Sequence, residues 1–252
     1  MFVAGIDVGM ESTKVVIMKD GGVIGRSKIS TGGFDRPEQI SGAYAQALGN
    51  AAIASGDIEK ATATGIGKYD VPFEVSTVTE TISAGHAVRY LFPEASGFIS
   101  VGADETIAAT MGGGRLIAEY AINQKCTAGL GTFLKHLARR LEMTMEQAGE
   151  LSGVNAVVIN EGCVVFSELD ALGLLCKGTL REAVMASATN AAAARAATVY
   201  NDLTIPPEGS VALIGGLAKN KAFAAALEKC LGFRFLINED AEYCGAIGAA
   251  LA

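Results

Sequence analysis

Residues 5–14 read GIDVGMESTK, and they join the end of one predicted strand to the start of another. The apolar and β-branched residues in and around this stretch predict a strand over residues 2–8, which ends in a small-residue turn, and a second strand over residues 13–19. Asp20-Gly21-Gly22 predicts another turn, and residues 23–30 a third strand. The chain therefore begins with an antiparallel β-meander.

A helix and a fourth strand follow the meander. Pro37 is a favourable residue for a first helical turn, and the helical spacing after it continues towards Gly56, which we predict to end the helix. Residues 60–67, KATATGIG, predict a strand. The first part of the chain thus has the order meander, helix, strand.

The same order returns near residue 97. Residues 98–123 predict a strand, a turn at Gly102-Ala103-Asp104, a second strand, a glycine turn and a third strand, and a helix follows Cys126. The segment IDVG at residues 6–9 aligns with ISVG at residues 99–102. We interpret this self-similarity as an internal duplication.

The duplication predicts an α/β protein with two lobes, residues 1–94 with about 240–252 and residues 95–239. Each lobe begins with a strand that ends in a small-residue turn. Glycine in such a turn lets backbone N–H groups approach an anion such as a phosphate. We therefore expect a clamp in which the two turns face one nucleotide cleft between the lobes.

A glycine pair, Gly215-Gly216, ends another predicted strand at residues 211–214. Ligands of α/β sheets usually bind at the carboxyl ends of strands, so the pair is a third candidate ligand contact. A helix is predicted from about Lys219 to Leu231, with Gly232 as its stop. Close packing of this helix on the strand is the alternative explanation for the glycine pair.

The composition argues against several classes of partner and site. A net charge of −7 without a long Lys/Arg run argues against nucleic acid. No apolar stretch reaches the roughly 18 residues of a membrane helix. The N-terminus lacks the pattern of a secretory signal, so we expect a cytoplasmic protein. Five cysteines in a reducing compartment argue against a disulfide scaffold and leave buried thiols or metal ligands.

Five motifs resemble a known family, in the same order and over the whole chain. They are GIDVGMESTK (5–14), NQKCTAGLGTFL (123–134), NEGCVVFSE (160–168), LIGGLAKN (213–220) and YCGAIGAAL (243–251). The family is that of the BadF/BadG/BcrA/BcrD-type ATPases, which include activators of 2-hydroxyacyl-CoA dehydratases and ATPase subunits of benzoyl-CoA reductase. The resemblance implies a duplicated ribonuclease-H-like clamp, the fold of actin, acetate and sugar kinases and heat-shock chaperones.

The resemblance also implies an iron–sulfur cluster. In the family a homodimer holds one 4Fe-4S cluster between its subunits, and by motif position the ligands here are Cys126 and Cys163. Four thiolates complete such a cluster, so a chain with two suitably placed cysteines needs a second copy. Both cysteines precede helical patterns, and a helix N-terminus stabilises a thiolate. Two buried structural thiols are the alternative for this pair, and we expect Cys176, Cys230 and Cys244 to be core thiols.

Carried over residue by residue, the resemblance implies a site for ATP or ADP with Mg²⁺. Asp7 would orient Mg²⁺-bound water, and Asp104 is the best local candidate for positioning the attacking water or the metal, since phosphoryl transfer depends on placement and charge neutralisation. The other residues expected to line the nucleotide site are Gly9, Ser12, Thr13, Lys14, Glu80, Gly102, Ala103, Gly215, Gly216, Ala218, Lys219 and Asn220.

Both turns depart from the family pattern. Met10-Glu11 stand where the family usually has Ser-Thr, and a carboxylate beside a triphosphate is unfavourable unless a metal or Lys14 intervenes. The family's Asp-Ile-Gly-Gly-Gln-Asp corresponds to SVGADE at residues 100–105, which removes an acidic group from the strand and adds one to the turn. Hydrolysis of ATP can persist with shifted ligands, or be slow or absent.

The sequence leaves three functions open. The first is an ATP-dependent activator that accepts electrons from ferredoxin or flavodoxin and delivers a low-potential electron to an iron–sulfur dehydratase or reductase. The second is a small-molecule kinase of the same fold, acting on a sugar or a carboxylate with Asp104 as the base. The third is a clamp that binds nucleotide or a cluster without turnover.

Overall fold

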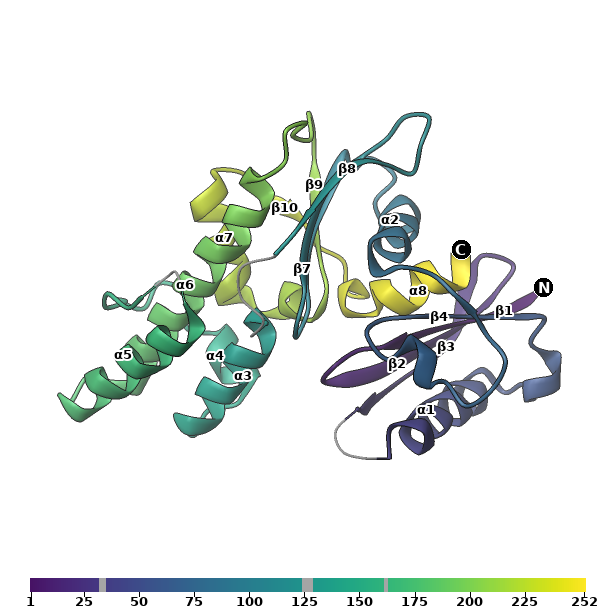
Figure 1. Cartoon of the computed structure of the whole chain (residues 1–252), viewed down its shortest axis with the longest axis horizontal. Coiled ribbons are helices and arrows are strands. Elements are labelled where there is room, and N and C mark those ends of the chain that lie inside the picture. Colours follow the sequence, from purple (N-terminus) through teal and green to yellow (C-terminus); the bar gives the residue numbers. More distant parts are fainter. Residues whose placement is uncertain (32–34, 124–128, 161–162) are drawn as a thin grey trace. The chain divides into compact units, whose positions relative to one another are not determined.

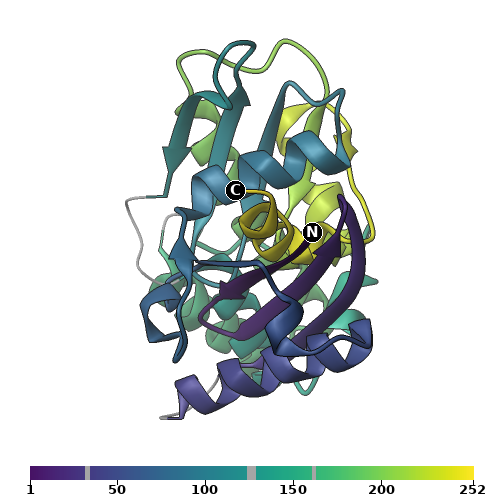
Figure 2. The ribbon, with the colours of Figure 1, turned by 90° about the vertical axis from the view of Figure 1, so that its right-hand side faces the viewer.

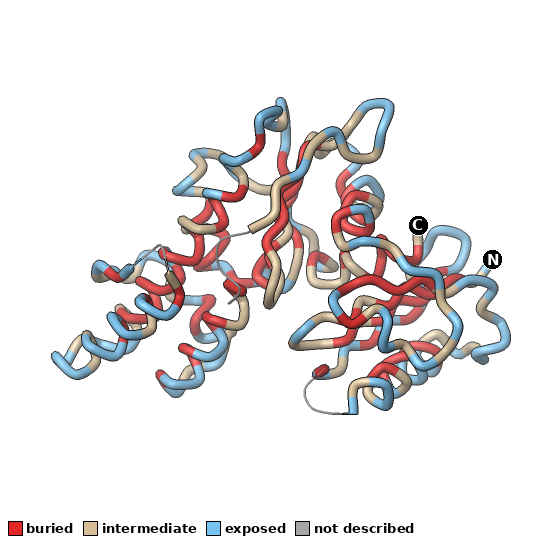
Figure 3. The backbone as a smooth tube through the Cα atoms, in the orientation of Figure 1, coloured by how far each residue is buried: buried red, intermediate tan, exposed pale blue. Residues whose placement is uncertain are grey.

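The computed structural model describes residues 1–31, 35–123, 129–160 and 163–252. Within these ranges the chain divides into two compact units, one formed by Met1–Glu94 with Tyr243–Ala252 and the other by Ala95–Glu242. Each unit has its own sheet and its own buried apolar residues (Figures 1 and 3). Cys126 lies outside the described residues.

The first unit begins with the predicted meander. Strands β1 (Phe2–Val8), β2 (Ser12–Lys19) and β3 (Gly22–Ser30) pair in antiparallel order. Two parallel strands, β4 (Lys60–Thr64) and β5 (Ser76–Thr77), lie on the other side of β1. The described part of this unit thus contains a five-stranded sheet in the order β3-β2-β1-β4-β5.

Helices cover both faces of the first sheet. Helix α1 (Arg36–Ala51) lies over β2 and β3, α8 (Cys244–Leu251) lies on the opposite face over β1 and β4, and α2 (Glu80–Leu91) packs against α8 (Figures 1 and 2). Two short 3-10 helices, η1 (Ser55–Asp57) and η2 (Lys68–Asp70), flank β4. A methyl group on Gly5 of β1 would lie 1.8 Å from the carbonyl oxygen of Ala246, so the approach of α8 depends on this glycine.

The second unit repeats the topology of the first. Its strands are β6 (Gly97–Val101), β7 (Thr106–Met111), β8 (Ile117–Ile122), β9 (Val211–Ile214) and β10 (Phe235–Leu236). Within the described residues they form a sheet in the order β10-β9-β6-β7-β8, in which β7 and β8 are antiparallel and β9 and β10 parallel to their neighbours. Reversed, this order matches that of the first sheet, which confirms the predicted duplication.

Helix α6 (Arg181–Asn201) is the centre of the second unit. It packs against β7, and α3 (Leu130–Arg140), α5 (Val164–Cys176) and α7 (Lys221–Leu231) each pack against it, while the short α4 (Met145–Gly149) contacts α3 and α7. Many of its buried residues are alanines, which let neighbouring helices approach closely. Although α6 has 21 residues, no described helix is both long and apolar enough to cross a membrane.

The end of α1 differs from the prediction. The helix stops at Ala51, and Ala52 takes a left-handed conformation with φ 54°, from which its N–H donates to the carbonyl of Gly49. Gly56 lies instead within η1. The predicted stop was wrong because a non-glycine residue adopted the left-handed conformation that glycine usually supplies.

Candidate functional site

The turn between β1 and β2 holds the first group of predicted nucleotide ligands. The N–H of Gly9 donates to the carbonyl of Ser12 at 3.1 Å, which closes the turn. The carbonyl of Glu11 accepts the N–H of Thr31 at 3.1 Å, which ties the turn to the end of β3. Met10 is exposed at the tip. One hydrogen bond thus closes the turn, and another holds it against the end of β3.

Asp7 and Lys14 form an ion pair beside this turn. The two residues are directly opposite each other in the register of β1 and β2, and Lys14 Nζ lies 3.4 Å from Asp7 Oδ2. Both side chains are mostly buried, so solvent screens the pair less than a surface pair. Lys14 therefore places a positive charge against Asp7 beside this turn.

Two residues that the sequence analysis did not assign to the site lie against Asp7. Thr64 is its partner across β1 and β4, and the buried hydroxyl of Thr64 has no hydrogen-bond partner among the described residues. A methyl group on Gly245, near the start of α8, would lie 2.7 Å from Asp7 Cγ. Asp7 is therefore closely packed, and an unused buried hydroxyl of this kind suits a ligand or a bound water.

Glu80 and Thr13 already have partners within the first unit. Lys68 Nζ lies 3.2 Å from Glu80 Oε1 and 3.4 Å from the carbonyl of Gly65. The sequence analysis did not name Lys68 as a candidate site residue. Its position just after the glycine turn that follows β4 could have indicated it. Thr13 is fully buried and its hydroxyl hydrogen-bonds with that of Thr31 at 3.1 Å, so its side chain is engaged in the core.

The turn between β6 and β7 repeats the geometry of the first turn. The N–H of Gly102 donates to the carbonyl of Glu105 at 2.9 Å, the counterpart of the bond from Gly9 to Ser12. Asp104 is half-buried between them. The two predicted phosphate turns therefore share one backbone arrangement, one in each unit.

Helix α3 begins on the second turn. The N–H groups of Gly131 and Thr132 donate to the carbonyls of Gly102 at 3.2 Å and Ala103 at 3.0 Å. A methyl group on Gly129 would lie 1.9 Å from the carbonyl oxygen of Ala103, so the approach requires glycine. Backbone hydrogen bonds thus join the start of α3 to the turn.

Asn123, on the other side of the Cys126 segment, is bonded to the same hairpin. Its N–H donates to the carbonyl of Thr106 at 3.1 Å, and its side-chain oxygen accepts the N–H of Thr106 at 2.8 Å. Residues 124–128 lie outside the described residues, but both of their flanks contact the β6–β7 hairpin. A displacement of this hairpin therefore acts on both flanks of the segment that contains Cys126.

Gly215 follows β9 as Gly65 follows β4. Their φ angles are 90° and 89°, and a methyl group on either residue would lie 2.5 Å from the carbonyl oxygen of Val101 or Val8, respectively. Close packing therefore explains Gly215. Gly216 is exposed, and a methyl group there would meet nothing within 4 Å, which leaves room for a ligand.

The three residues predicted near the nucleoside differ in their surroundings. Ala218 is buried, and Lys219 Nζ pairs with Glu242 Oε1 at 2.5 Å. Asn220 is 6% exposed, and its Oδ1 accepts the N–H of Phe223 at 2.9 Å as the N-cap of α7. Its buried Nδ2 has no partner among the residues that the structure describes. A buried donor without a hydrogen bond lowers the stability of the fold, and a bound molecule could accept this hydrogen bond. Asn220 is therefore the best candidate of the three to contact a ligand.

Cys163 is the N-cap residue of α5. Its N–H donates to Asn160 Oδ1 at 2.8 Å, and its thiol is half-buried. The N–H groups of Phe166 and Val165 hold the pKa of the thiol below its ordinary value. A partly accessible thiol that favours the thiolate at a helix N-terminus suits a metal ligand. Cys163 therefore has the properties of a cluster ligand, and its assignment, like that of Cys126, stays a prediction.

The remaining cysteines are not all core residues. Cys244 is buried, as predicted, but Cys176 and Cys230 are exposed, and the prediction was wrong for these two. Both occupy the last turn of a helix, on its solvent side. Within the described ranges no group of three or more His, Cys, Asp or Glu residues is arranged to hold a metal ion.

Helix α5 exposes apolar side chains close to Cys163. These residues, the α5 strip, are Val165 (61% exposed), Phe166 (58%), Leu169 (58%) and Leu172 (36%). The residues that α5 buries are Val164, Ser167 and Ala171, and Figure 3 shows how much of the helix is exposed. Apolar side chains exposed along one side of a helix are a candidate interaction surface.

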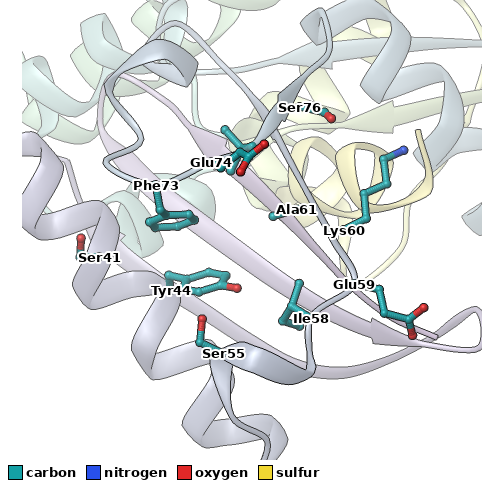
Figure 4. Close-up of a pocket in the computed structure, with 11 residues that line it drawn as sticks. Ser41, Tyr44, Ser55, Ile58, Glu59, Lys60, Ala61, Phe73, Glu74 and Ser76 are labelled. Atoms are coloured by element: carbon teal, nitrogen blue, oxygen red, sulfur yellow. The ribbon is translucent and has the colours of Figure 1, made fainter.

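A cavity of about 670 Å³ lies in the first unit, between α1 and the edge formed by β4 and β5 (Figure 4). Tyr44 and Phe73 lie side by side in it, with ring centres 4.6 Å apart, and Glu74 and Lys60 belong to its polar lining. None of the predicted site residues lines this cavity. It is therefore not part of the candidate nucleotide site.

Comparisons with known proteins support the predicted fold. A structure of the activator of the 2-hydroxyisocaproyl-CoA dehydratase from Clostridium difficile, with bound ADPNP, matches with a TM-score of 0.90 and 26% identity, covering 100% of this chain and 93% of that one. A ROK family glucokinase from Streptomyces griseus, in complex with glucose and AMPPNP, matches with a TM-score of 0.62 and 13% identity over 99% of this chain and 98% of that one. The second likeness shows the fold alone, and together they confirm the predicted sugar-kinase-like architecture.

Sequence comparisons identify the family. The (R)-2-hydroxyglutaryl-CoA dehydratase activating ATPase of Acidaminococcus fermentans is 29% identical over an alignment 257 residues long, which covers 100% of this chain and 96% of that protein. The family model described as the BadF/BadG/BcrA/BcrD ATPase family matches residues 4–252. The matched range includes both turns, Cys163 and the C-terminal helix that packs on Asp7. This chain belongs to the BadF/BadG/BcrA/BcrD ATPase family.

Proposed function

We propose that this protein is an ATP-dependent iron–sulfur activator, which delivers a low-potential electron to a partner dehydratase or reductase. One observation carries the proposal. Asn123 and Gly131, on the two sides of the Cys126 segment, both hydrogen-bond to the β6–β7 hairpin. The turn that we propose to bind phosphate and the flanks of the segment that contains a candidate cluster ligand thus belong to one hydrogen-bonded arrangement around this hairpin within one unit.

The nucleotide part of the proposal rests on the two equivalent turns. In each turn a glycine leaves backbone N–H groups close to an approaching anion. We infer that ATP or ADP binds with Mg²⁺, that Asp7 orients metal-bound water, and that Lys14 balances the charge of the acidic residues nearby. Asp104 is the candidate that positions the attacking water. Asn220, with its unused buried Nδ2, is the candidate donor to the nucleoside.

The cluster part of the proposal assigns Cys126 and Cys163 as ligands. Cys163 fits because the N–H groups at the start of α5 stabilise its thiolate and because its sulfur is partly accessible. A 4Fe-4S cluster would supply one-electron chemistry at low potential. The chain itself supplies the thiolates, fixes the two helix starts that follow them, and links one of these starts to the nucleotide turn.

We propose further that two copies of the chain share the cluster. Two cysteines from each copy would supply the four thiolates that such a cluster needs. The α5 strip begins two residues after Cys163, so a second copy that completes the cluster would also cover Val165 and Phe166. Burying apolar surface at such a contact contributes about 25 cal/mol per Å².

The proposed partners follow from the relatives. A relative named an activating ATPase of (R)-2-hydroxyglutaryl-CoA dehydratase supports an iron–sulfur dehydratase, or a related reductase, as the electron acceptor. Ferredoxin or flavodoxin would supply the electron, because either is a soluble carrier of low potential.

Iron analysis and ATP hydrolysis on anaerobically purified protein test the proposal. We expect about four iron atoms per two chains, lost in Cys126→Ala and in Cys163→Ala. Cys230→Ala is the matched control, because it removes an exposed thiol outside both motifs and should keep the iron. ATP hydrolysis should fall at least about 100-fold in Asp7→Asn, as expected when a group that places metal or water is lost.

Two outcomes would overturn the proposal. A colourless monomer that phosphorylates a sugar or a carboxylate would identify a kinase of the same fold. A protein that binds iron and ATP but releases no phosphate would identify a clamp without turnover.

A further inference from the structure

Arg195 contacts the helices that follow both candidate cluster ligands. Its Nη2 donates to the carbonyl of Asn160 at 3.2 Å and to the hydroxyl of Ser167 at 2.5 Å. Its guanidinium carbon lies 5.6 Å from the ring centre of Phe133, in the first turn of α3. One side chain of the central helix α6 thus reaches the starts of both α3 and α5.

Asn160 and Ser167 are the residues that hold the backbone of Cys163. Asn160 Oδ1 accepts the N–H of Cys163 at 2.8 Å. The hydroxyl of Ser167 lies 2.9 Å from the carbonyl of Cys163 and 2.5 Å from that of Asn160, and Ser167 is fully buried. Arg195 therefore acts on Cys163 through both of its neighbours.

The chemistry of arginine suits this position. Its guanidinium is planar, carries several N–H donors in a fixed arrangement, and remains charged at every physiological pH. It can donate to two oxygens and lie over an aromatic ring at the same time. A lysine would keep the charge but would not reproduce this combination of contacts.

We propose that Arg195 is a positioning residue for the cluster ligands: it fixes the start of α5 relative to α3 and places a permanent positive charge beside Cys163. The inference rests on the proposed function. A cluster with thiolate ligands becomes more negative when it is reduced, and a nearby positive charge favours the reduced state. Arg195 thus has a geometric role, present without the cluster, and an electrostatic role that requires it.

Hydrogen exchange on cluster-free protein tests the geometric role. In Arg195→Gln we expect the amides of the peptide 160–167 to exchange about tenfold faster or more, because charge-assisted hydrogen bonds to Asn160 and Ser167 are lost. Arg181→Gln is the matched control, since Arg181 lies on the same helix and donates to the carbonyls of Leu141 and Glu142. Unchanged exchange in Arg195→Gln, or an equal effect in Arg181→Gln, would overturn the geometric role.

The midpoint potential of the loaded protein tests the electrostatic role. Arg195→Gln should shift the potential to a more negative value, whereas Arg195→Lys, which keeps the charge, should stay near the wild-type value while its 160–167 peptide still exchanges faster. An unchanged potential in Arg195→Gln would overturn this role. A wild-type protein without iron would instead remove the proposed function, and the exchange experiment would still decide whether Arg195 fixes α5.

Discussion

The replacement Gly245→Ala tests whether the packing of α8 sets the position of Asp7. The new methyl group would lie 2.7 Å from both Cγ and Oδ2 of Asp7, and ordinary contact begins at 3.4 Å, so the carboxylate must move by 0.7 Å or α8 must lift. Overpacking of this kind costs about 1–3 kcal/mol of the free energy of unfolding. Because a misplacement of about 1 Å can cost about 100-fold in rate, we expect kcat for ATP hydrolysis to fall roughly 10- to 100-fold.

Urea unfolding and steady-state ATP hydrolysis at saturating Mg²⁺ measure the two effects. Gly49→Ala is the matched control, because Gly49 is an exposed residue in the last turn of α1 and a methyl group there would meet nothing within 4 Å. This control should keep kcat and gain up to about 1 kcal/mol of stability from its higher helix propensity. If Gly245→Ala unfolds and hydrolyses ATP like the wild type, the proposed role of α8 in placing Asp7 is refuted.

Two further predictions concern the proposed dimer and the stability of the second unit. Leu169→Glu should raise the dissociation constant of the proposed dimer by about tenfold or more, because it introduces a charge into the α5 strip. Leu180→Glu, at an exposed leucine outside the strip, is the control and should leave the dissociation constant unchanged. Sedimentation velocity measures both variants, and an equal effect would contradict the assignment of the strip as the dimer contact. Hydrogen bonds from the hydroxyl of Thr204 and the N–H of Ile205 lower the pKa of Glu119. Its carboxylate therefore stabilises the fold at any pH above the ordinary pKa of a glutamate, and this stabilisation is lost as the pH falls through the lowered pKa. Glu119→Gln should therefore lower the urea midpoint at pH 7, and this deficit should shrink as the pH falls below the ordinary pKa of a glutamate, about 4.3. A deficit that does not change with pH would contradict this reasoning.

The sequence predicted the sheets well because their signals are local. The β-branched residues of β1 stop just before Gly9, and this pattern predicts both the end of the strand and the turn after it. The same pattern before Gly102 predicts the end of β6. The parallel strands β4 and β9 each end at a glycine whose φ is positive, which the sequence marks directly. The end of α1 was missed because no residue type marks the left-handed conformation of Ala52.

Helix α5 shows the limit of periodicity. Its apolar spacing correctly predicted a helix, but Val165 and Leu169 face solvent while Ser167 is buried. Ser167 can be buried because its hydroxyl bonds to the carbonyls of Asn160 and Cys163. Which face of a helix is buried depends on such contacts, and a hydrophobic pattern does not contain them.

The sequence motifs indicated which residues belong to the candidate site, but they did not indicate which of these residues contact one another. The motif residues Asp7 and Lys14 do pair in register, and their spacing across a tight hairpin made this predictable. The contacts of Gly245 with Asp7 and of Arg195 with Asn160 join residues far apart in the sequence, so no local pattern indicates them. They emerge only from the packing of helices on sheets.

The effect of ATP on the proposed cluster tests whether nucleotide binding is coupled to electron transfer. The midpoint potential and visible spectrum of the anaerobically purified protein would be measured with Mg²⁺ alone and with Mg²⁺ and ATP. Because the β6–β7 hairpin is bonded to both flanks of the Cys126 segment, we predict that ATP shifts the potential and alters the spectrum. A cluster whose potential and spectrum are the same with and without ATP, or a protein that holds no iron, would contradict this coupling.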